Sequence, residues 1–277
     1  MVCAFQGWND AGDAASTAAS FMSTALGAKR FAQVDTEEFY DFQANRPRIR
    51  IGEEGEREIE WPSVEMFEAA VPRAPRDLVF VQGVEPSLRW RAFSSLIVEL
   101  AEALGVQMVI TLGALLADVP HTRPVAMTGF ASDPALLESM GAAGPGSYEG
   151  PTGIVGVLHS IASDAGLPSM SLWASIPHYV AAAPSPKAAL ALVRRLESLV
   201  GVSVDASELE RASLTYERQV GLAVSSDPDV QAFVERLERD AESEDEPLTL
   251  EDLPSGDLLA SEFQRFLRQR GGQGGSK

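Results

Sequence analysis

The sequence contains little positive charge and very little lysine. Its 277 residues include 22 lysines and arginines against 40 aspartates and glutamates, which gives a formal net charge of −18. The lysines are Lys29, Lys187 and Lys277. Binding to nucleic acid or to an anionic membrane requires a basic face, so the composition argues strongly against both classes of partner. A mechanism that clamps several phosphates with lysine side chains is disfavoured for the same reason.

The sequence also has one cysteine and no long apolar run. Cys3 cannot form an intramolecular disulfide and has no CxxC partner for a metal or redox site. No segment reaches the roughly 18 apolar residues of a membrane span. The N-terminus lacks the basic region and apolar block of a signal peptide. We therefore expect a cytoplasmic protein without a metal or a cofactor. A predicted strand near the start leaves open whether residues precede Met1.

Strand and helix patterns alternate along most of the chain. Short apolar runs rich in β-branched residues predict buried strands, and apolar residues at helical spacing predict helices between them. The predicted strands are 2–6, 78–82, 106–112, 124–130 and 169–176. The predicted helices are 14–26, 90–104, 134–140, 153–165, 186–200, 206–222 and one opened by Asp227 and Pro228. The predicted N-caps of four of these helices are Asp13, Asp133, Thr152 and Ser185. We expect 31–40 to be extended and 48–51 to form a hairpin with 57–61. The alternation predicts an α/β fold with a largely parallel sheet.

The stretch from residue 106 to residue 125 places polar groups directly after a predicted buried strand. Gly113 is the predicted end of that strand, and Asp118, His121 and Arg123 follow in a loop that two prolines stiffen. In α/β folds, ligands usually meet the sheet just past the carboxyl end of a central strand. The alternative interpretation, which the sequence supports equally, is a loop whose polar side chains bond its own backbone.

Four further residues complete the candidate pocket. Asp10 lies in the turn after the first strand, His178 follows the 169–176 strand, and Tyr148 and Glu149 lie in the glycine-rich loop 141–156. In this hypothesis His121 is a base oriented by Asp118, and Arg123 binds a carboxylate. The glycine-rich loop matches neither a Walker loop nor GxGxxG. Because GxSxG, HExxH and a Cys/His pair are also missing, no named reaction follows, and purely structural roles remain open.

The composition changes after Gly201. We predict an α/β core domain over residues 1–201, a helical extension with an acidic segment over residues 202–270, and a disordered tail over residues 271–277. Within the extension, residues 258–270 form a predicted amphipathic helix with an apolar stripe. This stripe is expected to pack on its own domain or on a neighbouring subunit.

Several blocks of sequence occur in the order found in one known family. They are GWNDAGDAAS, TLGALLADVPHTRPV, YEGPTGIVGVLH, GLPSMSLWASIPHYV and SPKAALALVRRLESLVG. On these blocks, over about residues 2–201, the chain resembles an actinobacterial member of the proteasome assembly chaperone (type two) family. The resemblance implies a three-layer α/β/α fold akin to the phosphorylase/hydrolase-like fold. It also implies self-association, with a homotrimer as the family analogy, or assembly with related subunits.

The resemblance leads to two hypotheses about function. Eukaryotic relatives escort α subunits of the core proteasome into a ring, and archaeal relatives bind proteasomes partly through a C-terminal hydrophobic–Tyr–any-residue tail, which the GGQGGSK end does not match. We therefore expect a non-enzymatic protein-binding or assembly factor with proteasome subunits among its partners. The alternative is an enzyme, either an ATP-dependent carboxylate-amine ligase, a label the family has also carried, or a hydrolase. Its pocket would include Asp10, Asp118, His121, Glu149 and His178.

Overall fold

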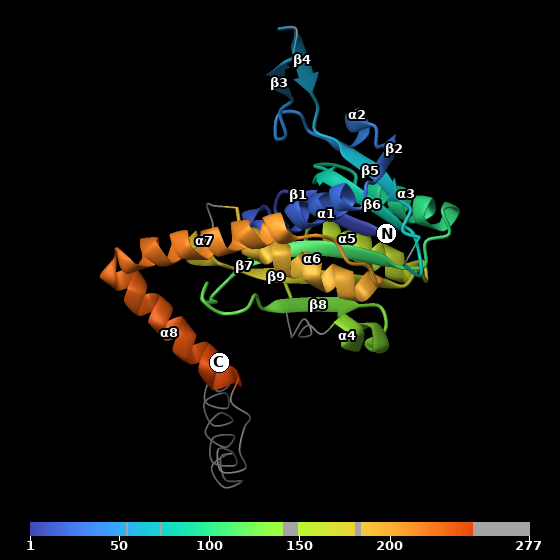
Figure 1. Ribbon diagram of the computed structural model, residues 1–277. Coiled ribbons are helices and arrows are strands. Elements are labelled where there is room, and N and C mark those ends of the chain that lie inside the picture. Colours follow the sequence, from blue (N-terminus) through green and yellow to red (C-terminus); the bar gives the residue numbers. More distant parts are fainter. Residues whose placement is uncertain (54, 73, 141–148, 181–183, 246–277) are drawn as a thin grey trace, which may run out of the picture.

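A seven-stranded sheet forms the centre of the molecule. The computed structural model describes residues 1–53, 55–72, 74–140, 149–180 and 184–245. The strands of the main sheet are β1 (Val2–Gln6), β2 (Lys29–Gln33), β5 (Val64–Ala69), β6 (Leu78–Val84), β7 (Val109–Ala117), β8 (Met127–Ala131) and β9 (Ser169–Pro177). Their order in space is β2-β5-β6-β1-β7-β9-β8. The central strands β6, β1, β7 and β9 are parallel, whereas β5 and β8 run antiparallel to β6 and β9. The predicted α/β fold with a mixed, largely parallel sheet is therefore confirmed (Figure 1).

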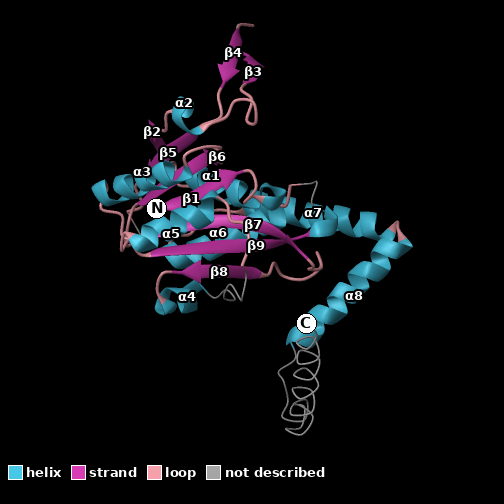
Figure 2. Cartoon of the chain, turned by 180° about the vertical axis from the view of Figure 1, so that it is seen from behind, coloured by secondary structure: helices cyan, strands magenta, loops and turns pink. Residues whose placement is uncertain are grey.

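Helices cover both faces of this sheet. On one face lie α1 (Ala14–Ala25) and α6 (Pro186–Val200), and on the other lie α3 (Trp90–Ala103) and α5 (Ile154–Asp164). Figures 1 and 2 present the molecule from opposite sides. The alanines of α1 at positions 14, 15, 18 and 19 are fully buried, so this helix lies close against the strands. Short elements complete this part: η1 (Ala11–Asp13), α2 (Thr36–Phe39), α4 (Pro134–Met140) and η2 (His178–Val180).

Strand β7 is longer than the sequence predicted, because its partner is equally long. Gly113 does not end the strand; β7 pairs with β9 in parallel register from Val109 to Ala117. A Cβ atom at Gly113 would lie 2.5 Å from the ring of Trp173, its partner on β9. The glycine therefore leaves room for a large neighbouring side chain rather than breaking the strand. The prediction that the strand ends there was wrong.

The region before the hairpin also differs from the prediction. Residues 31–40 are not extended throughout, because β2 ends at Gln33 and the short helix α2 follows. Asp35 caps this helix by accepting a hydrogen bond from the backbone N–H of Glu37 (3.1 Å). Strand β5 was not predicted, although it pairs with both β2 and β6. Its glutamates at positions 65 and 68 interrupt the apolar pattern that marks the other strands.

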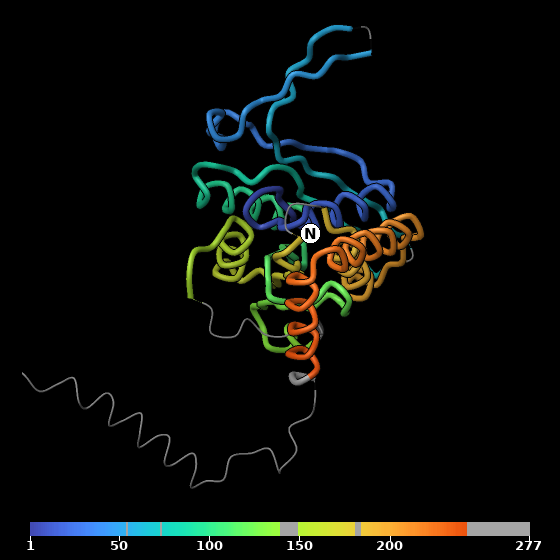
Figure 3. The backbone as a smooth tube through the Cα atoms, turned by 90° about the vertical axis from the view of Figure 1, so that its left-hand side faces the viewer, coloured from blue at the N-terminus to red at the C-terminus, as the bar shows by residue number. Residues whose placement is uncertain are grey.

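Strands β3 (Arg48–Ile51) and β4 (Arg57–Glu60) form a separate antiparallel hairpin, which confirms that part of the prediction. We call this hairpin the arm. It projects away from the main sheet (Figures 1 and 3), and every residue of both strands is exposed. At its base the ring of Phe42 meets the ring of Trp61 edge-on, with centroids 4.8 Å apart.

Two long helices follow the sheet. Helix α7 (Ser207–Ser225) packs along α6, and α8 (Pro228–Asp245) turns back from its end at a sharp angle (Figures 1 and 3). Tyr216, Val220 and Val224 of α7 share a small apolar cluster with Val234 of α8. None of the helices within the described residues combines the length and the apolar character needed to cross a membrane. The predicted helix at 258–270 and the predicted tail at 271–277 lie outside the described residues.

Local capping chemistry was predicted correctly at some helices and wrongly at others. Ser185 caps α6, and Asp133 accepts a hydrogen bond from Ala135 N (2.7 Å) at the start of α4, as expected. Asp13, however, has a left-handed backbone (φ 50°) and makes no capping bond. The cap of α1 is Asp10, whose Oδ1 accepts hydrogen bonds from Ala15 N (2.7 Å) and Ser16 N (3.2 Å). The 3₁₀ turn η1 lies between these residues and brings Asp10 back to the helix start. Thr152 is likewise not the cap of α5.

This assignment predicts unequal effects at the two aspartates. Asp10→Ala removes the capping acceptor of α1 and should lower the free energy of unfolding by about 1 kcal/mol. Asp13→Asn, which keeps a side chain tolerated at positive φ, should change it by less than about 0.5 kcal/mol. Urea denaturation followed by circular dichroism measures both values. Equal losses in the two variants would contradict the assignment.

Candidate functional site

The carboxyl end of the sheet contains a junction centred on Glu85, the residue after β6. Its backbone N–H donates to Gln6 O of β1 (2.8 Å). Its carboxylate accepts hydrogen bonds from Trp8 N (3.2 Å), Asn9 Nδ2 (2.7 Å) and Ile154 N (3.0 Å). One side chain therefore joins the turn after β1, the end of β6 and the start of α5. The negative charge suits this place, because unpaired backbone amides at a helix start favour an anion.

Two buried polar side chains, Asn9 and Asp10, lie in the turn after β1. Asn9 Oδ1 and Asp10 Oδ2 have no hydrogen-bond partner within the described part of the chain. Burial raises the pKa of Asp10, against the hydrogen bonds from Ser16 and Ala15, which act in the opposite direction. A Cβ atom on Gly153 would lie 2.0 Å from Asn9 Oδ1, so the close approach of α5 to this turn requires glycine. Contacts with Glu85, with the start of α1 and with Gly153 before α5 therefore fix the turn after β1.

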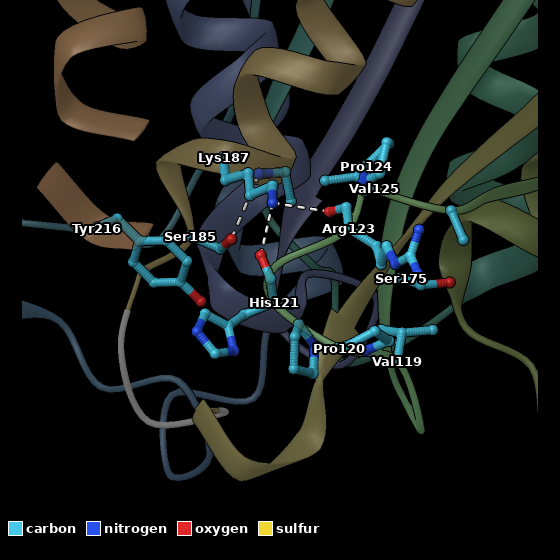
Figure 4. Close-up of a pocket in the computed structure, with 13 residues that line it drawn as sticks. Val119, Pro120, His121, Arg123, Pro124, Val125, Ser175, Ser185, Lys187 and Tyr216 are labelled. Carbon is cyan, nitrogen blue, oxygen red and sulfur yellow. Dashed lines mark hydrogen bonds between the residues drawn. The ribbon is translucent and has the colours of Figure 1, made fainter. Parts of the chain in front are cut away.

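A small pocket lies between the loop after β7, the start of α6 and α7 (Figure 4). Its volume is about 20 Å³, enough for about one water molecule. The lining residues are Val119, Pro120, His121, Arg123, Pro124, Val125, Ala126, Ser175, Pro177, Ser185, Lys187, Ala188 and Tyr216. Two of the seven predicted site residues, His121 and Arg123, are therefore in its wall.

Lys187 of α6 is the central side chain of this pocket. Its ammonium donates to His121 O (2.6 Å), Arg123 O (2.7 Å) and Glu217 Oε1 of α7 (2.5 Å). An ammonium group has three hydrogens, so these partners use its full donor capacity. Figure 4 shows the side chain pointing at the two carbonyls of the loop. A cation near a helix start opposes the helix dipole, and these three acceptors compensate for that placement.

His121 is buried and bonded to Tyr179 of η2. The backbone N–H of His121 donates to the Tyr179 hydroxyl (2.7 Å), which also lies 2.9 Å from His121 Nδ1. The Tyr179 hydroxyl thus holds both the backbone and the ring of His121. Burial and the nearby Lys187 lower the pKa of His121, and Glu238 and Glu217 oppose them. Burial also raises the pKa of Tyr179 to about 12. Both rings are neutral at neutral pH.

Helix α8 closes over the same loop. Glu242 pairs with Arg123, and Glu238 accepts a hydrogen bond from the hydroxyl of Thr122. Phe233 packs edge-on against the rings of His178 and Tyr179, with centroids 5.4 Å and 6.1 Å apart. The loop after β7 therefore lies between Lys187 on one side and α8 on the other.

The other described site residues do not line the pocket and lie in different places. Asp118 and His178 meet each other, with His178 Nδ1 and Asp118 Oδ1 2.9 Å apart, and both are partly or largely exposed. Asp10 caps α1, and Glu149 is exposed on the loop before α5; neither lines the pocket. Tyr148 lies outside the described residues. The idea that Asp118 orients His121 has no contact to support it, because each of the two has another described partner.

Sequence reasoning missed three residues that organise this region. Glu85, Lys187 and Tyr179 make the contacts that join segments far apart in the chain. Lys187 did give a usable signal. It is one of three lysines in the sequence, and it lies in the first turn of a predicted helix, where a positive charge opposes the helix dipole and is stabilised by nearby acceptors. Glu85 and Tyr179 gave no comparable signal. Among the described residues, no group of three His, Cys, Asp or Glu side chains is placed to hold a metal ion.

Comparison with known proteins identifies relatives over most of the chain. The model of the PAC2 family matches residues 4–223. A PAC2 family protein from Streptomyces avermitilis is 46% identical, with 84% of this chain and 98% of that chain covered and a TM-score of 0.77. A Mycobacterium tuberculosis proteasome-assembly chaperone homologue is 41% identical, with the same coverage and TM-score.

A more distant structure shares the fold alone. An archaeal proteasome activator from Pyrococcus furiosus is 17% identical, covers 80% of this chain and 92% of that chain, and has a TM-score of 0.65. None of the curated proteins matches the chain. The family match spans the sheet, the helices on both faces and most of α7, and it confirms the resemblance found in the sequence. The chain belongs to the PAC2 family.

Proposed function

We propose that this protein is a non-enzymatic assembly factor that binds proteasome subunits and also associates with copies of itself. The observation that carries the proposal is the 41% identity, over 84% of the chain, to the M. tuberculosis proteasome-assembly chaperone homologue. The polar groups at the carboxyl end of the sheet support it. Lys187, His121 and Glu85 each bond to other segments of the protein, as a rigid binding surface requires.

Exposed apolar side chains at the carboxyl end of the sheet are the docking surface in this proposal. Trp8, Leu115 and Leu116 are 63%, 38% and 49% exposed, and we call them the rim patch. The backbone hydrogen bond from Ala114 N to Asn9 O (2.8 Å) joins the turn that carries Trp8 to the end of β7, which carries Leu115 and Leu116. Exposed tryptophan is a frequent anchor of protein interfaces. The net charge of −18 favours a basic surface on the partner.

Binding to proteasome subunits tests this proposal. The purified full chain should form a complex with core-proteasome α subunits of its own organism, measured by size-exclusion chromatography with light scattering and by titration calorimetry. Trp8→Ala and Leu116→Ala should weaken the affinity, by about tenfold or more for Trp8→Ala.

A matched variant controls for loss of apolar surface. Leu104, which is 47% exposed, lies between α3 and β7, at the amino end of the parallel strands and thus opposite the rim patch. Leu104→Ala should therefore leave the affinity unchanged. No complex with either α or β subunits at micromolar concentration would overturn the proposed function. Equal weakening of the affinity by Leu104→Ala and Leu116→Ala would show that the rim patch is not the docking surface.

The enzyme alternative gains no support from this arrangement. The pocket beside His121 has a volume of about 20 Å³, whereas small-molecule sites usually enclose about 300 Å³ or more. Within the described residues, both functional atoms at its centre, Lys187 Nζ and His121 Nδ1, have protein partners. We therefore propose that these residues hold the loop and the C-terminal helices in place.

Removal of the ammonium group should loosen the contact between the loop and α7. Lys187→Met leaves Glu217 and two carbonyls without their donor and should lower the free energy of unfolding by about 1–3 kcal/mol. Amide hydrogen exchange should show lost protection in α7. Lys29→Met, at an exposed lysine of β2, is the matched control and should have little effect. Unchanged protection in α7 would contradict the role assigned to Lys187.

Acidification should destabilise the protein partly through His121. Because burial lowers the pKa of this residue below 6.5, the unfolded chain takes up a proton there before the folded protein does. Stability is therefore lost as the pH falls below about 6.5. In His121→Gln, the loss of stability between about pH 7.5 and about pH 5.5 should be smaller than in the unmodified protein. Parallel stability curves for the two proteins would count against a buried neutral His121.

A further inference from the structure

The rim patch lies close to the point where the described chain ends. Leu116 is followed by the loop after β7, and helix α8 is attached to that loop near its own end, where Glu242 pairs with Arg123. Figure 3 shows α8 running down this side of the molecule. Helix α8 ends at Asp245, three residues after Glu242. The chain therefore continues from a point beside the carboxyl end of the sheet, where the rim patch is exposed.

The sequence of residues 258–270 has the two properties that the proposed function requires of a partner. It reads LLASEFQRFLRQR, which predicts an amphipathic helix with Phe263, Phe266 and Leu267 on one side. It carries three arginines and one glutamate, in a chain with a net charge of −18. An amphipathic helix binds through its apolar side, and complementary charge selects where it binds. The segment thus combines apolar side chains with positive charge, as a partner of the rim patch would.

Charge favours the rim patch over two other exposed apolar surfaces. Leu214 and Leu222 of α7 are exposed, but Arg218 lies between them at helical spacing and is exposed as well. The isoleucines of the arm share their face with Arg57. At the rim patch, by contrast, Asp118 follows Leu116 after one residue, and its side chain is 80% exposed. A basic segment is therefore attracted to the rim patch more than to α7 or the arm.

The connection between α8 and this segment is long enough to reach the rim patch. Twelve residues, 246–257, lie between Asp245 and the segment. A chain of that length spans at most about 40 Å, which exceeds the diameter of about 30 Å of a small domain. A short tether also gives an effective concentration of about 1 mM. At micromolar protein concentration the segment therefore meets the rim patch of its own chain far more often than that of a neighbouring copy.

We propose that residues 258–270 bind the rim patch of their own chain and compete there with the protein partner. The inference rests on the proposed function, because it concerns the regulation of the same docking surface. If the segment alone binds with a dissociation constant of about 0.1 mM, a tether at about 1 mM covers the patch about nine-tenths of the time and weakens partner binding about tenfold. A partner must then displace the segment, which excludes surfaces that bind the rim patch weakly.

Hydroxyl-radical labelling of the full chain, read by mass spectrometry, tests whether the patch is covered. Phe263→Ser with Phe266→Ser removes most of the apolar side of the segment and should raise the labelling rate of Trp8 about tenfold. Trp61, which is 43% exposed at the base of the arm, should be labelled equally in both proteins. Gln264→Ser with Gln269→Ser, outside the apolar side, is the matched control and should leave Trp8 protected. Equal labelling of Trp8 in the unmodified chain and the phenylalanine variant overturns the proposal.

Disulfide trapping in the full chain tests where the segment binds. Cys3 is buried, so the added cysteines are the reactive ones. Leu116→Cys with Phe263→Cys should form a disulfide within one chain on mild oxidation. Leu104→Cys with Phe263→Cys, at the amino end of the parallel strands, should not. A disulfide that joins two chains overturns binding to the same chain, and equal trapping of both pairs overturns the choice of the rim patch.

Partner binding separates this inference from the proposed function. The phenylalanine variant should bind core-proteasome α subunits about tenfold more tightly than the unmodified chain does. An unchanged affinity, with Trp8 more strongly labelled in the variant, overturns the competition. If α subunits bind and the labelling of Trp8 does not respond, the inference fails and the proposed function stands. If Trp8 responds and neither protein binds a proteasome subunit, the proposed function fails and the covering of the rim patch stands.

Discussion

The ammonium group of Lys187 is the constraint on which the C-terminal half of the molecule depends. It lies at the start of α6 and contacts the loop after β7 and the side chain of Glu217 on α7. Helix α7 in turn shares an apolar cluster with α8, and α8 returns to the same loop through Glu238 and Glu242. The loop, α6, α7 and α8 thus form a closed set of contacts. The C-terminal helices are consequently part of the surface at the edge of the sheet.

The carboxyl end of the sheet is built in the same way around an opposite charge. Glu85 receives hydrogen bonds from two residues of the turn after β1 and from the first residue of α5. Glu85 and Lys187 are half-buried, and a charged group away from bulk water is stable when its hydrogen-bonding capacity is used. Glu85 and Lys187 each bind groups from segments that are distant in sequence. Two ionic side chains therefore determine how the loops around the central strands are presented.

The sequence was sufficient for features that depend on local chemistry. The apolar runs identified the central parallel strands, and Ser185 and Asp133 marked helix starts because their side chains bond backbone groups a few residues away. Features that depend on distant contacts were missed. The sequence predicted a strand end at Gly113, whereas in the structure this glycine leaves room for Trp173 of β9. It also predicted Asp13 as the cap of α1, whereas the 3₁₀ turn brings Asp10 to that position. The candidate site was predicted in part: the loop of His121 and Arg123 does line a pocket, but tertiary contacts give its polar groups partners.

A surface that binds proteins and a site that catalyses a reaction make different demands on polar groups. A general base must have an acceptor atom available within reach of its substrate, in a space that the substrate can enter. At His121 the ring nitrogen Nδ1 meets a tyrosine hydroxyl, and the space beside it holds about one water molecule. A binding surface gains instead from side chains that lose little freedom on association, because ordering them lowers affinity. Glu85 holds the turn that carries Trp8, and Lys187 holds the loop that follows Leu115 and Leu116. Such preorganisation suits the binding of another protein, the function proposed above.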